Sequence, residues 1–415
     1  MIKGINFIGL GKLGLPLATC IAKNGIYVNA IDKNEELIFK LNQNEIPWLE
    51  EGLAKNLEIA RSYINYSNNF DLLYKFDTSI VLVNTPSNKK DGSFSNIFVE
   101  QVLMEIGKRM KKGHTIILSS TVMPGSILES FVPLIENVSG LSLKKGEFGF
   151  GYVPDFVALG NIINDFENPD FLVIGNSDNI TFQKAKEIYS RILRNSPEIL
   201  NRSLPETELI KVSLNAYITT KISFANFLGL MARRMKGNIN VDAVTSAVGL
   251  DSRIGRKYFS SGVSYGGTCF PRDTWAFIKS AENVGLNAQQ MHANEIINDL
   301  VDKEWLSEIL LSECEQVYLI GASFKPGTSV TTEGMTEKLL PKLIKRNLKV
   351  FVVDDNIEAL ANIKKLFFDV NVNFSDTSLE FQENSIIIVT IPDKRYTLLN
   401  YGNNKILDPW NLFRR

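Results

Sequence analysis

One cysteine of this chain lies in a setting that favours chemistry. Cys269 follows two glycines and a threonine, precedes Phe270 and Pro271, and is followed four residues later by the carboxylate of Asp273. Glycines let a backbone approach a ligand closely, and proline stiffens the exit from a turn. A thiol in such a partly exposed turn can act as a nucleophile, whereas a cysteine buried in a regular element is usually inert. The stretch therefore predicts a catalytic thiol, with a structural cysteine in a tight turn as the alternative.

The histidines and the other cysteines narrow the choice of chemistry. His114 and His292 are the only two histidines, and neither has a metal ligand close by in the sequence. This argues against a mechanism built on a histidine base, such as that of the Ser-His-Asp hydrolases. Cys20 and Cys314 lie far from Cys269, which argues against a disulfide framework and against zinc-finger spacing. We therefore expect chemistry from Cys, Lys, Asp or Thr side chains, and no metal.

The composition limits the class of protein and its partners. A chain of 415 residues is too long for one ordinary core, so we expect about two or three domains. A hydrophobic fraction of 44% and a net charge of −1 are typical of a soluble globular protein with no general attraction to nucleic acid or anionic membranes. No apolar run approaches the ~20 residues that span a bilayer. The chain enters a strand-like segment almost at once, so we expect no signal peptide. The three widely separated cysteines fit a reducing cytoplasm best.

The first elements predict a dinucleotide-binding unit. Ile5–Ile8 has the pattern of a buried parallel strand, and the glycines of Gly9–Gly14 follow it in the spacing G-x-G-x-x-G before a helix. Such glycines allow a tight turn, leave room for a pyrophosphate and let the helix pack closely on the strand. A second predicted strand, Tyr27–Ile31, ends at Asp32, whose carboxylate can accept hydrogen bonds from a ribose diol. It would repel a 2′-phosphate, so NAD is favoured over NADP.

Two further predicted strands end in threonines. Ser79–Pro86 and Thr115–Val122 each have the pattern of a strand that leads into a loop, and they place Thr85 and Thr121 at their carboxyl ends. Ligands of open α/β sheets bind at that edge. Both hydroxyls are therefore candidate ligand contacts, with helix capping as the alternative.

These segments resemble, in order, those of the UDP-glucose/GDP-mannose dehydrogenase family. The sequence GGTCFPRD around Cys269 is close to the family's GGSCFPKD, and the resemblance covers essentially the whole chain. It implies an α/β fold with two Rossmann-like doubly wound domains, joined by a long central helix and a helical dimerisation domain. The other matching segments are Gly9–Gly14, Thr85-Pro86, Ser120-Thr121-Val122, Pro124-Gly125, Pro154-Asp155-Phe156 and Asn168-Pro169-Asp170.

A long helix is expected over residues 206–236. Lys211 and Asn215 are four residues apart on it and share a face. Taken alone, such a pair is usually two solvated side chains, but the segment is similar to the family's central helix. The resemblance implies that both side chains reach the active site and that the helix forms much of a homodimer interface. We also expect an apolar stripe along this helix, made of Leu209, Leu214, Ile218, Ile222 and Leu228.

The resemblance implies oxidation of the C6 alcohol of a nucleotide sugar to a carboxylate, with NAD as the acceptor of two hydrides. The Cys269 thiolate adds to the aldehyde formed first, a thioester forms, and water hydrolyses it. Lys211 and Asn215 would stabilise the oxyanion, while Asp273 and Thr121 would hold a water that transfers protons. Asp155 takes the place of a glutamate that the family uses in thioester hydrolysis.

The resemblance also assigns cofactor and substrate contacts, including Arg253, which would reach the nucleotide sugar across a subunit boundary. The expected cofactor contacts are Gly9, Gly11, Lys12, Leu13, Gly14, Asp32, Thr85, Thr121 and Arg272. The expected substrate contacts are Phe156, Lys211, Asn215, Arg253, Tyr258, Tyr265, Gly266, Phe270, Phe324 and Lys325.

The C-terminal part predicts a second nucleotide-binding-like domain. Val317–Gly321, Val350–Asp355 and Ser385–Ile391 have the pattern of strands, and a helix is expected over 333–346. The resulting domain boundaries are 1–200 for NAD binding, 201–300 for the helical part with the cysteine, and 301–415 for the UDP sugar.

Several positions depart from the family pattern. Leu159 stands where the family has a second glutamate, Phe227 ends a segment that ends in glutamate, and Thr332 replaces a cofactor-side arginine. A substrate-binding D-G-R segment reads Asp408-Pro409-Trp410 here. UDP-glucose is the favoured substrate, and UDP-N-acetylhexosamines and GDP-mannose stay open. A catalytically degenerate nucleotide-sugar binder and a two-electron 3-hydroxyacid dehydrogenase are the alternatives from other classes.

Overall fold

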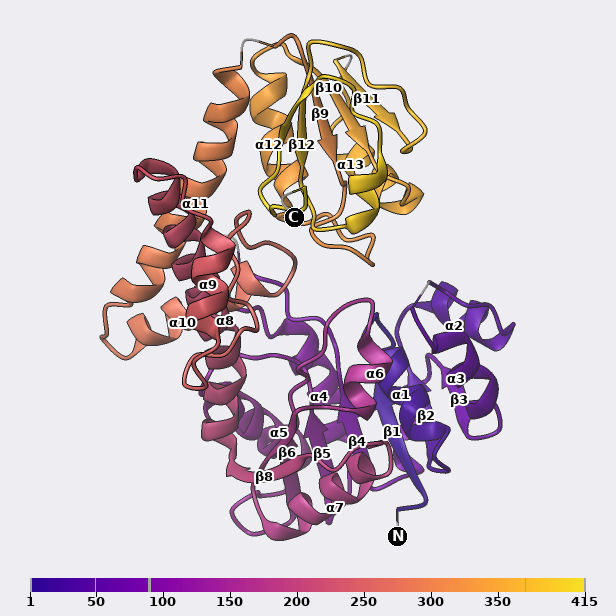
Figure 1. Ribbon diagram of the computed structural model, residues 1–415. Coiled ribbons are helices and arrows are strands. Elements are labelled where there is room, and N and C mark those ends of the chain that lie inside the picture. Colours follow the sequence, from indigo (N-terminus) through magenta and orange to yellow (C-terminus); the bar gives the residue numbers. More distant parts are fainter. Residues whose placement is uncertain (1, 49, 89–90, 313, 370, 414–415) are drawn as a thin grey trace. The chain divides into compact units, whose positions relative to one another are not determined.

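The chain folds into two compact units, residues 1–213 and 214–415 (Figure 1). The computed structural model describes residues 2–48, 50–88, 91–312, 314–369 and 371–413. Each unit contains one sheet with Rossmann-type strand order, and the second unit also contains the helical part of the chain. The predicted α/β fold class with two such sheets is confirmed. Within the described ranges, no helix is long and apolar enough to cross a membrane.

The first unit is built on an eight-stranded sheet with the order β3-β2-β1-β4-β5-β6-β7-β8. All neighbouring strands are parallel except β6 and β7. The chain reverses the direction of strand addition between β1 and β4, and open sheets of this kind bind ligands beside that point. The strands are β1 (Gly4–Ile8), β2 (Tyr27–Ile31), β3 (Ile64–Ser67), β4 (Thr78–Val81), β5 (His114–Leu118), β6 (Phe148–Tyr152), β7 (Phe171–Asn176) and β8 (Glu198–Ser203).

Helices cover both faces of this sheet, because alternate residues of its buried strands point to opposite faces. On one face Phe7 and Ile5 pack with residues of α1, α2, α3, α6 and α7. On the other face Ile8 and Val81 pack with residues of α4, η2 and α5. The bounds are α1 (Gly14–Ala22), α2 (Glu35–Asn42), α3 (Leu53–Ala60), η1 (Phe70–Tyr74), α4 (Ile97–Arg109), η2 (Ile127–Phe131), α5 (Val132–Ser139), α6 (Ile162–Glu167) and α7 (Asn179–Ser190).

The long helix α8 spans Leu204–Arg234, close to its predicted bounds. The residues of the expected apolar stripe lie at or near the surface: Leu209 is 51% exposed, and the other four members are partly exposed. The buried side is made largely of small and polar residues, because this side contacts loops and helices that carry polar groups. Its buried residues include Thr207, Glu208, Lys211, Val212, Ala216, Thr219, Ser223 and Asn226.

The second unit contains a five-stranded parallel sheet with the order β11-β10-β9-β12-β13. On one face it packs against α11, α12 and α13, and on the other against η3 and residues of the connecting segments, including Tyr401. The bounds are α9 (Val241–Gly249), α10 (Phe270–Asn283), α11 (Gln289–Leu310), β9 (Gln316–Ile320), α12 (Met335–Ile344), β10 (Lys349–Val353), α13 (Ile357–Leu366), β11 (Val372–Ser375), β12 (Ile386–Val389), η3 (Lys394–Leu398) and β13 (Lys405–Leu407).

Candidate active site

The turn after β1 has room for a pyrophosphate at one of its glycines. A Cβ atom on Gly9 would lie 2.1 Å from the carbonyl oxygen of Leu82, and one on Gly14 would lie 2.0 Å from that of Gly9. A Cβ atom on Gly11 would meet no atom within 4 Å. The outer two glycines are therefore required by the packing of the protein itself, while the position of Gly11 is exposed and open.

Asp32 lies at the carboxyl end of β2 and is oriented by backbone groups. Its Oδ2 accepts the Leu10 N–H at 2.7 Å, and its Oδ1 accepts the Asn34 N–H at 2.9 Å. A carboxylate oxygen can accept more than one hydrogen bond, so both oxygens can still accept a ribose hydroxyl. The predicted contacts Lys12 and Leu13 continue the glycine turn into α1, with Lys12 exposed and Leu13 partly exposed.

The structure brings Thr85 and Thr121 together at the carboxyl ends of β4 and β5. The Thr85 hydroxyl donates to the Thr121 carbonyl oxygen at 2.7 Å. The Ser120 hydroxyl accepts the Val83 N–H and donates to the Val83 carbonyl, each at 2.8 Å. Neither threonine caps the helix that follows it, because the N-caps of α4 and η2 are Asn96 and Ser126. Hydrogen bonds therefore join the loops after β4 and β5 beside the glycine turn. Helix capping does not explain the hydroxyls of the two threonines.

Substitution of Gly11 by valine should weaken NAD binding without unfolding the protein. The new side chain would occupy space that no protein atom uses. We expect the Kd for NAD to rise by at least about tenfold, which corresponds to ~1.4 kcal/mol, with the Tm unchanged. Titration calorimetry measures the first quantity and thermal unfolding the second. Gly14→Val is the contrast, because it should lower the Tm through its clash with Gly9. An unchanged Kd in the Gly11 variant would contradict the assignment.

Lys211 is held against the loop after β6. Its side chain is largely buried, with 8% of the residue exposed, and its ammonium donates to the Asp155 carbonyl oxygen. The same ammonium lies 4.9 Å from the centre of the Phe156 ring, within the range of a cation–π contact. A cation fixed at this sheet edge can stabilise a developing oxyanion. The structure therefore groups Lys211, Asp155 and Phe156.

The Asp155 carboxyl group is enclosed and incompletely paired. Its Oδ2 atom is buried without a hydrogen-bond partner. Burial raises the pKa of this carboxyl from its ordinary 3.8 to about 7, and the nearby charge of Lys211 opposes the rise. A carboxyl with a pKa near neutrality can both take up and release a proton during turnover. This arrangement suits Asp155 to proton transfer.

The same pKa makes stability depend on pH. Because the folded-state pKa of Asp155 lies above its ordinary value, its contribution to stability is fully present below about pH 4. That contribution is lost as the pH rises through about 7. We expect the Tm of the wild type to fall between about pH 5 and about pH 8, and to fall less in Asp155→Asn. Scanning calorimetry at both pH values checks this. The variant keeps Glu208, whose raised pKa of about 7 acts in the same direction, so a part of the fall remains. An equal fall in both proteins would contradict the prediction.

The cysteine turn lies in the second unit, directly before α10. Cys269 is exposed and is the N-cap residue of this helix. A Cβ atom on Gly266 would lie 2.0 Å from the Glu333 carbonyl oxygen, and one on Gly267 would lie 2.7 Å from the Phe324 ring. The Gly267 N–H donates to the Thr332 carbonyl at 2.9 Å. The two glycines thus let the turn pack directly on the segment before α12.

Further bonds fix the approach to this turn. Lys338 of α12 donates to the Ser264 hydroxyl at 3.0 Å and to the Tyr265 carbonyl at 3.2 Å. The Tyr265 hydroxyl donates to the partly buried Glu295, and Tyr265 itself is 4% exposed. Its side chain is thus committed to the interior. Sequence reasoning missed Lys338, and no local pattern could have revealed it, since it lies over 70 residues from its partners.

Asn215 and Asp273 are brought together beside the cysteine turn. The Asn215 amide donates to Asp273 Oδ2 at 2.6 Å, and Arg272 donates to Asp273 Oδ1 at 3.0 Å. Asp273 is 1% exposed, and its N–H donates to the Cys269 carbonyl at 2.8 Å as part of the first turn of α10. Asn215 and Asp273, each a predicted site residue, therefore form one bonded unit anchored to the helix that Cys269 begins.

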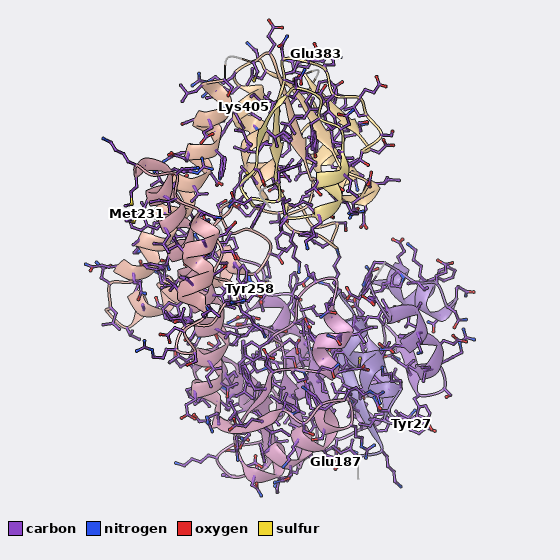
Figure 2. All side chains as sticks on the ribbon, viewed as in Figure 1. Tyr27, Glu187, Met231, Tyr258, Glu383 and Lys405 are labelled. Atoms are coloured by element: carbon purple, nitrogen blue, oxygen red, sulfur yellow. The ribbon has the colours of Figure 1, made fainter. Side chains whose placement is uncertain are left out.

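The remaining predicted substrate contacts lie in the second unit at surface or turn positions. Tyr258, labelled in Figure 2, is 50% exposed, has a φ of 61°, and meets the Phe270 ring edge to face at 5.9 Å. Arg253 is highly exposed and pairs with Asp251. Lys325 lies 5.7 Å from the ring of Phe324, which itself contacts the cysteine turn.

The chain is similar to known nucleotide-sugar dehydrogenases. Residues 3–193 match the NAD binding domain of the UDP-glucose/GDP-mannose dehydrogenase family, and residues 205–300 match its central domain. A UDP-glucose 6-dehydrogenase of Pseudomonas aeruginosa is 30% identical over 83% of this chain and 77% of that protein. A GDP-mannose 6-dehydrogenase of the same organism is also 30% identical, over 85% and 81%.

A solved structure agrees in fold. The UDP-glucose dehydrogenase of Pyrobaculum islandicum superposes with a TM-score of 0.90 at 26% identity, over 99% of this chain and 94% of that one. The chain therefore belongs to the UDP-glucose/GDP-mannose dehydrogenase family, whose members are NAD-dependent nucleotide-sugar dehydrogenases.

Proposed function

We propose that the protein oxidises the C6 alcohol of a nucleotide sugar to a carboxylate, with UDP-glucose as substrate and UDP-glucuronate as product. The observation that carries this proposal is the exposed Cys269 thiol, held on a two-glycine turn at the start of α10 beside the Asn215–Asp273 pair. A nucleophile of this kind serves the second oxidation, because an aldehyde must gain a substituent on carbon before it can lose a second hydride.

The proposed reaction consists of two oxidation steps and one hydrolysis. The alcohol loses a proton and a hydride to give the aldehyde, and the Cys269 thiolate then adds to the carbonyl carbon. The resulting thiohemiacetal loses a second hydride and becomes a thioester, and water releases the carboxylate and the free thiol. NAD, when bound at the glycine turn after β1, accepts the hydrides. Two NAD and one water are consumed per sugar, and two NADH are formed.

Lys211 and Asn215 stabilise the oxyanion in this scheme. They are one turn apart on α8, and a buried cation or amide near a developing negative charge lowers the barrier strongly. Asp155 acts in the release of the thioester, supported by its pKa of about 7. Asp273 and Thr121 each take part in proton transfer, the role that the family resemblance implies for them. Arg253, Phe324 and Lys325 bind the nucleotide sugar.

UDP-glucose is preferred because the cysteine segment is closest to that branch of the family. GDP-mannose and UDP-N-acetylhexosamines are the alternatives, and two relatives of equal identity act on different nucleotide sugars by name. Leu159 packs against the core of the first unit where the family pattern has a glutamate. The absence of this glutamate would explain slow hydrolysis of the thioester. We place the enzyme in the cytoplasm, where it would supply uronic acids for polysaccharide synthesis.

We also propose a homodimer that uses α8. Tyr217, Phe224 and Met231 are spaced by seven residues and therefore lie along one side of the helix. They are 64%, 53% and 42% exposed, and Met231 lies on the outside of the helical part (Figure 2). A row of exposed large apolar side chains is unusual on a monomer. Sedimentation velocity measures the oligomeric state.

The test of the reaction is a substrate panel. UDP-glucose, UDP-N-acetylglucosamine, UDP-N-acetylmannosamine and GDP-mannose are each incubated with NAD while absorbance at the NADH band is followed. The proposal expects the largest kcat/KM for UDP-glucose. Preference for another sugar would change the substrate, and binding without NADH formation on any of them would favour the degenerate binder.

A further inference from the structure

Glu208 is a buried carboxylate that the scheme above does not use. It is on α8, one turn before Lys211, and is 0% exposed. Its Oε2 accepts the Gly125 N–H at 3.0 Å, and its Oε1 accepts the Ile127 N–H at 2.9 Å. Both oxygens therefore bind backbone groups in the segment that leads from Thr121 into η2.

The carboxylate is held there against its own desolvation. Burial raises the pKa of Glu208 to about 7, while the hydrogen bonds from Ile127 and Gly125 oppose the rise, and the charge of nearby Glu129 adds to it. A buried carboxylate that accepts hydrogen bonds from two backbone N–H groups in this way is a specific structural link and not an incidental contact. Position 125 also requires a glycine, because the φ angle of Gly125 is +94°.

The same end of α8 ties a second loop. One turn further on, Lys211 donates to the carbonyl of Asp155, in the loop after β6. Strands β5 and β6 are neighbours in the sheet, so α8 fastens two adjacent loops at the carboxyl edge, one through an anion and one through a cation. The loop after β5 is also bound, through the carbonyl of Thr121, to Thr85 in the loop after the neighbouring strand β4.

We propose that Glu208 is a positioning residue, which fixes the segment 121–127 so that Thr121 keeps its place for catalysis. The inference rests on the role proposed for Thr121. Glu208 does not touch the reacting groups in this account. It acts through the backbone N–H groups of Gly125 and Ile127.

Glu208→Gln tests this tie. The glutamine keeps one acceptor oxygen, but its NH₂ group would face the other backbone donor, so one of the two bonds is lost. We expect the amide hydrogens of residues 121–127 to exchange at least about tenfold faster, because exchange follows the opening of the segment. We expect kcat to fall roughly 10- to 100-fold, as for other small misplacements of catalytic groups, with the KM values changed less than about threefold.

Asp178→Asn is the matched control. Asp178 also binds a backbone N–H at a helix start, that of Thr181 at 2.9 Å at the beginning of α7. It follows β7, which is antiparallel to β6, so it lies at the opposite edge of the sheet. We expect it to lower the Tm by about 2–4 °C and to leave kcat nearly unchanged.

The double variant Glu208→Gln with Thr121→Ala decides how Glu208 acts. If Glu208 works through Thr121, the double variant should be no slower than Thr121→Ala alone. Multiplicative losses, unchanged kcat in Glu208→Gln, or unchanged amide exchange in 121–127 would each overturn the inference. Exchange of the amide hydrogens is measured without substrate, so it does not depend on the proposed reaction. If the wild type forms no NADH, the proposed function fails, while the exchange result still shows whether Glu208 orders the segment.

Discussion

Cys269→Ser should abolish carboxylate formation while leaving the protein folded. Cys269 is exposed at the start of α10, so the exchange of one atom disturbs no packing. A serine hydroxyl is far less ionised than a thiol and is a poorer nucleophile toward the aldehyde at neutral pH. We expect the rate of complete oxidation to fall at least about 10³-fold, as losses of catalytic nucleophiles commonly do. Chromatography of the sugar products, with NADH measured in parallel, reports both half-reactions.

The other two cysteines are the controls for this prediction. Cys20 is fully buried, and burial raises the pKa of its thiol to about 12, so it stays protonated and inert. Cys314 is only partly exposed. Cys314→Ser should keep wild-type kinetics, and iodoacetamide should label Cys269 first. Carboxylate production by Cys269→Ser at more than about a tenth of the wild-type rate would exclude the covalent route.

Lys211→Ala should lower kcat by roughly 10²- to 10³-fold, the usual effect of removing one group that stabilises an oxyanion. The ammonium is buried beside Asp155 and Phe156, so no solvent cation replaces it readily. Its removal should also raise the pKa of Asp155 further, because the charge of Lys211 now lowers that pKa. The limb of the pH–rate profile that reports Asp155 should therefore move to higher pH. Steady-state kinetics from about pH 6 to about pH 9 measures both changes.

Lys40→Ala is the matched control for Lys211. Lys40 belongs to the same unit and pairs with Glu36 on the surface of α2, where ion pairs contribute little. It should leave kcat and the pH profile unchanged. If Lys211→Ala lowered kcat but left the limb where it was, Lys211 would not act on Asp155 in the way described. A kcat within about twofold of the wild-type value would show that Lys211 does not stabilise the oxyanion either.

The parts of the fold that repeat locally could be predicted from the sequence. The strand Tyr27–Ile31 was predicted with its observed bounds, because a short apolar run ended by Asp32 has few other interpretations. The strand pattern over Ser79–Pro86 was longer than β4, which ends at Val81. The loop beyond β4 is also apolar in part, and periodicity alone does not show where the pairing stops.

Hydrogen bonds between residues far apart in the chain could not be predicted from the sequence. The bonds from Lys338 to the cysteine approach and from Glu208 to the segment after Thr121 join residues about 70 to 80 positions apart. Their side-chain types are common on protein surfaces, so sequence alone favours solvated charges. Glu208 did leave one signal, a carboxylate one helical turn before Lys211. The buried side of α8 was missed for a related reason: it is made largely of small and polar residues, and several large apolar residues of the helix are exposed.

The amount of NADH formed per sugar tests the central claim most directly. The purified protein is given limiting UDP-glucose and excess NAD, and NADH, aldehyde and carboxylate are quantified at completion. A four-electron oxidation through Cys269 predicts two NADH for each carboxylate and no free aldehyde. One NADH per sugar with the product left as the aldehyde, from a protein with an intact Cys269, would contradict the account.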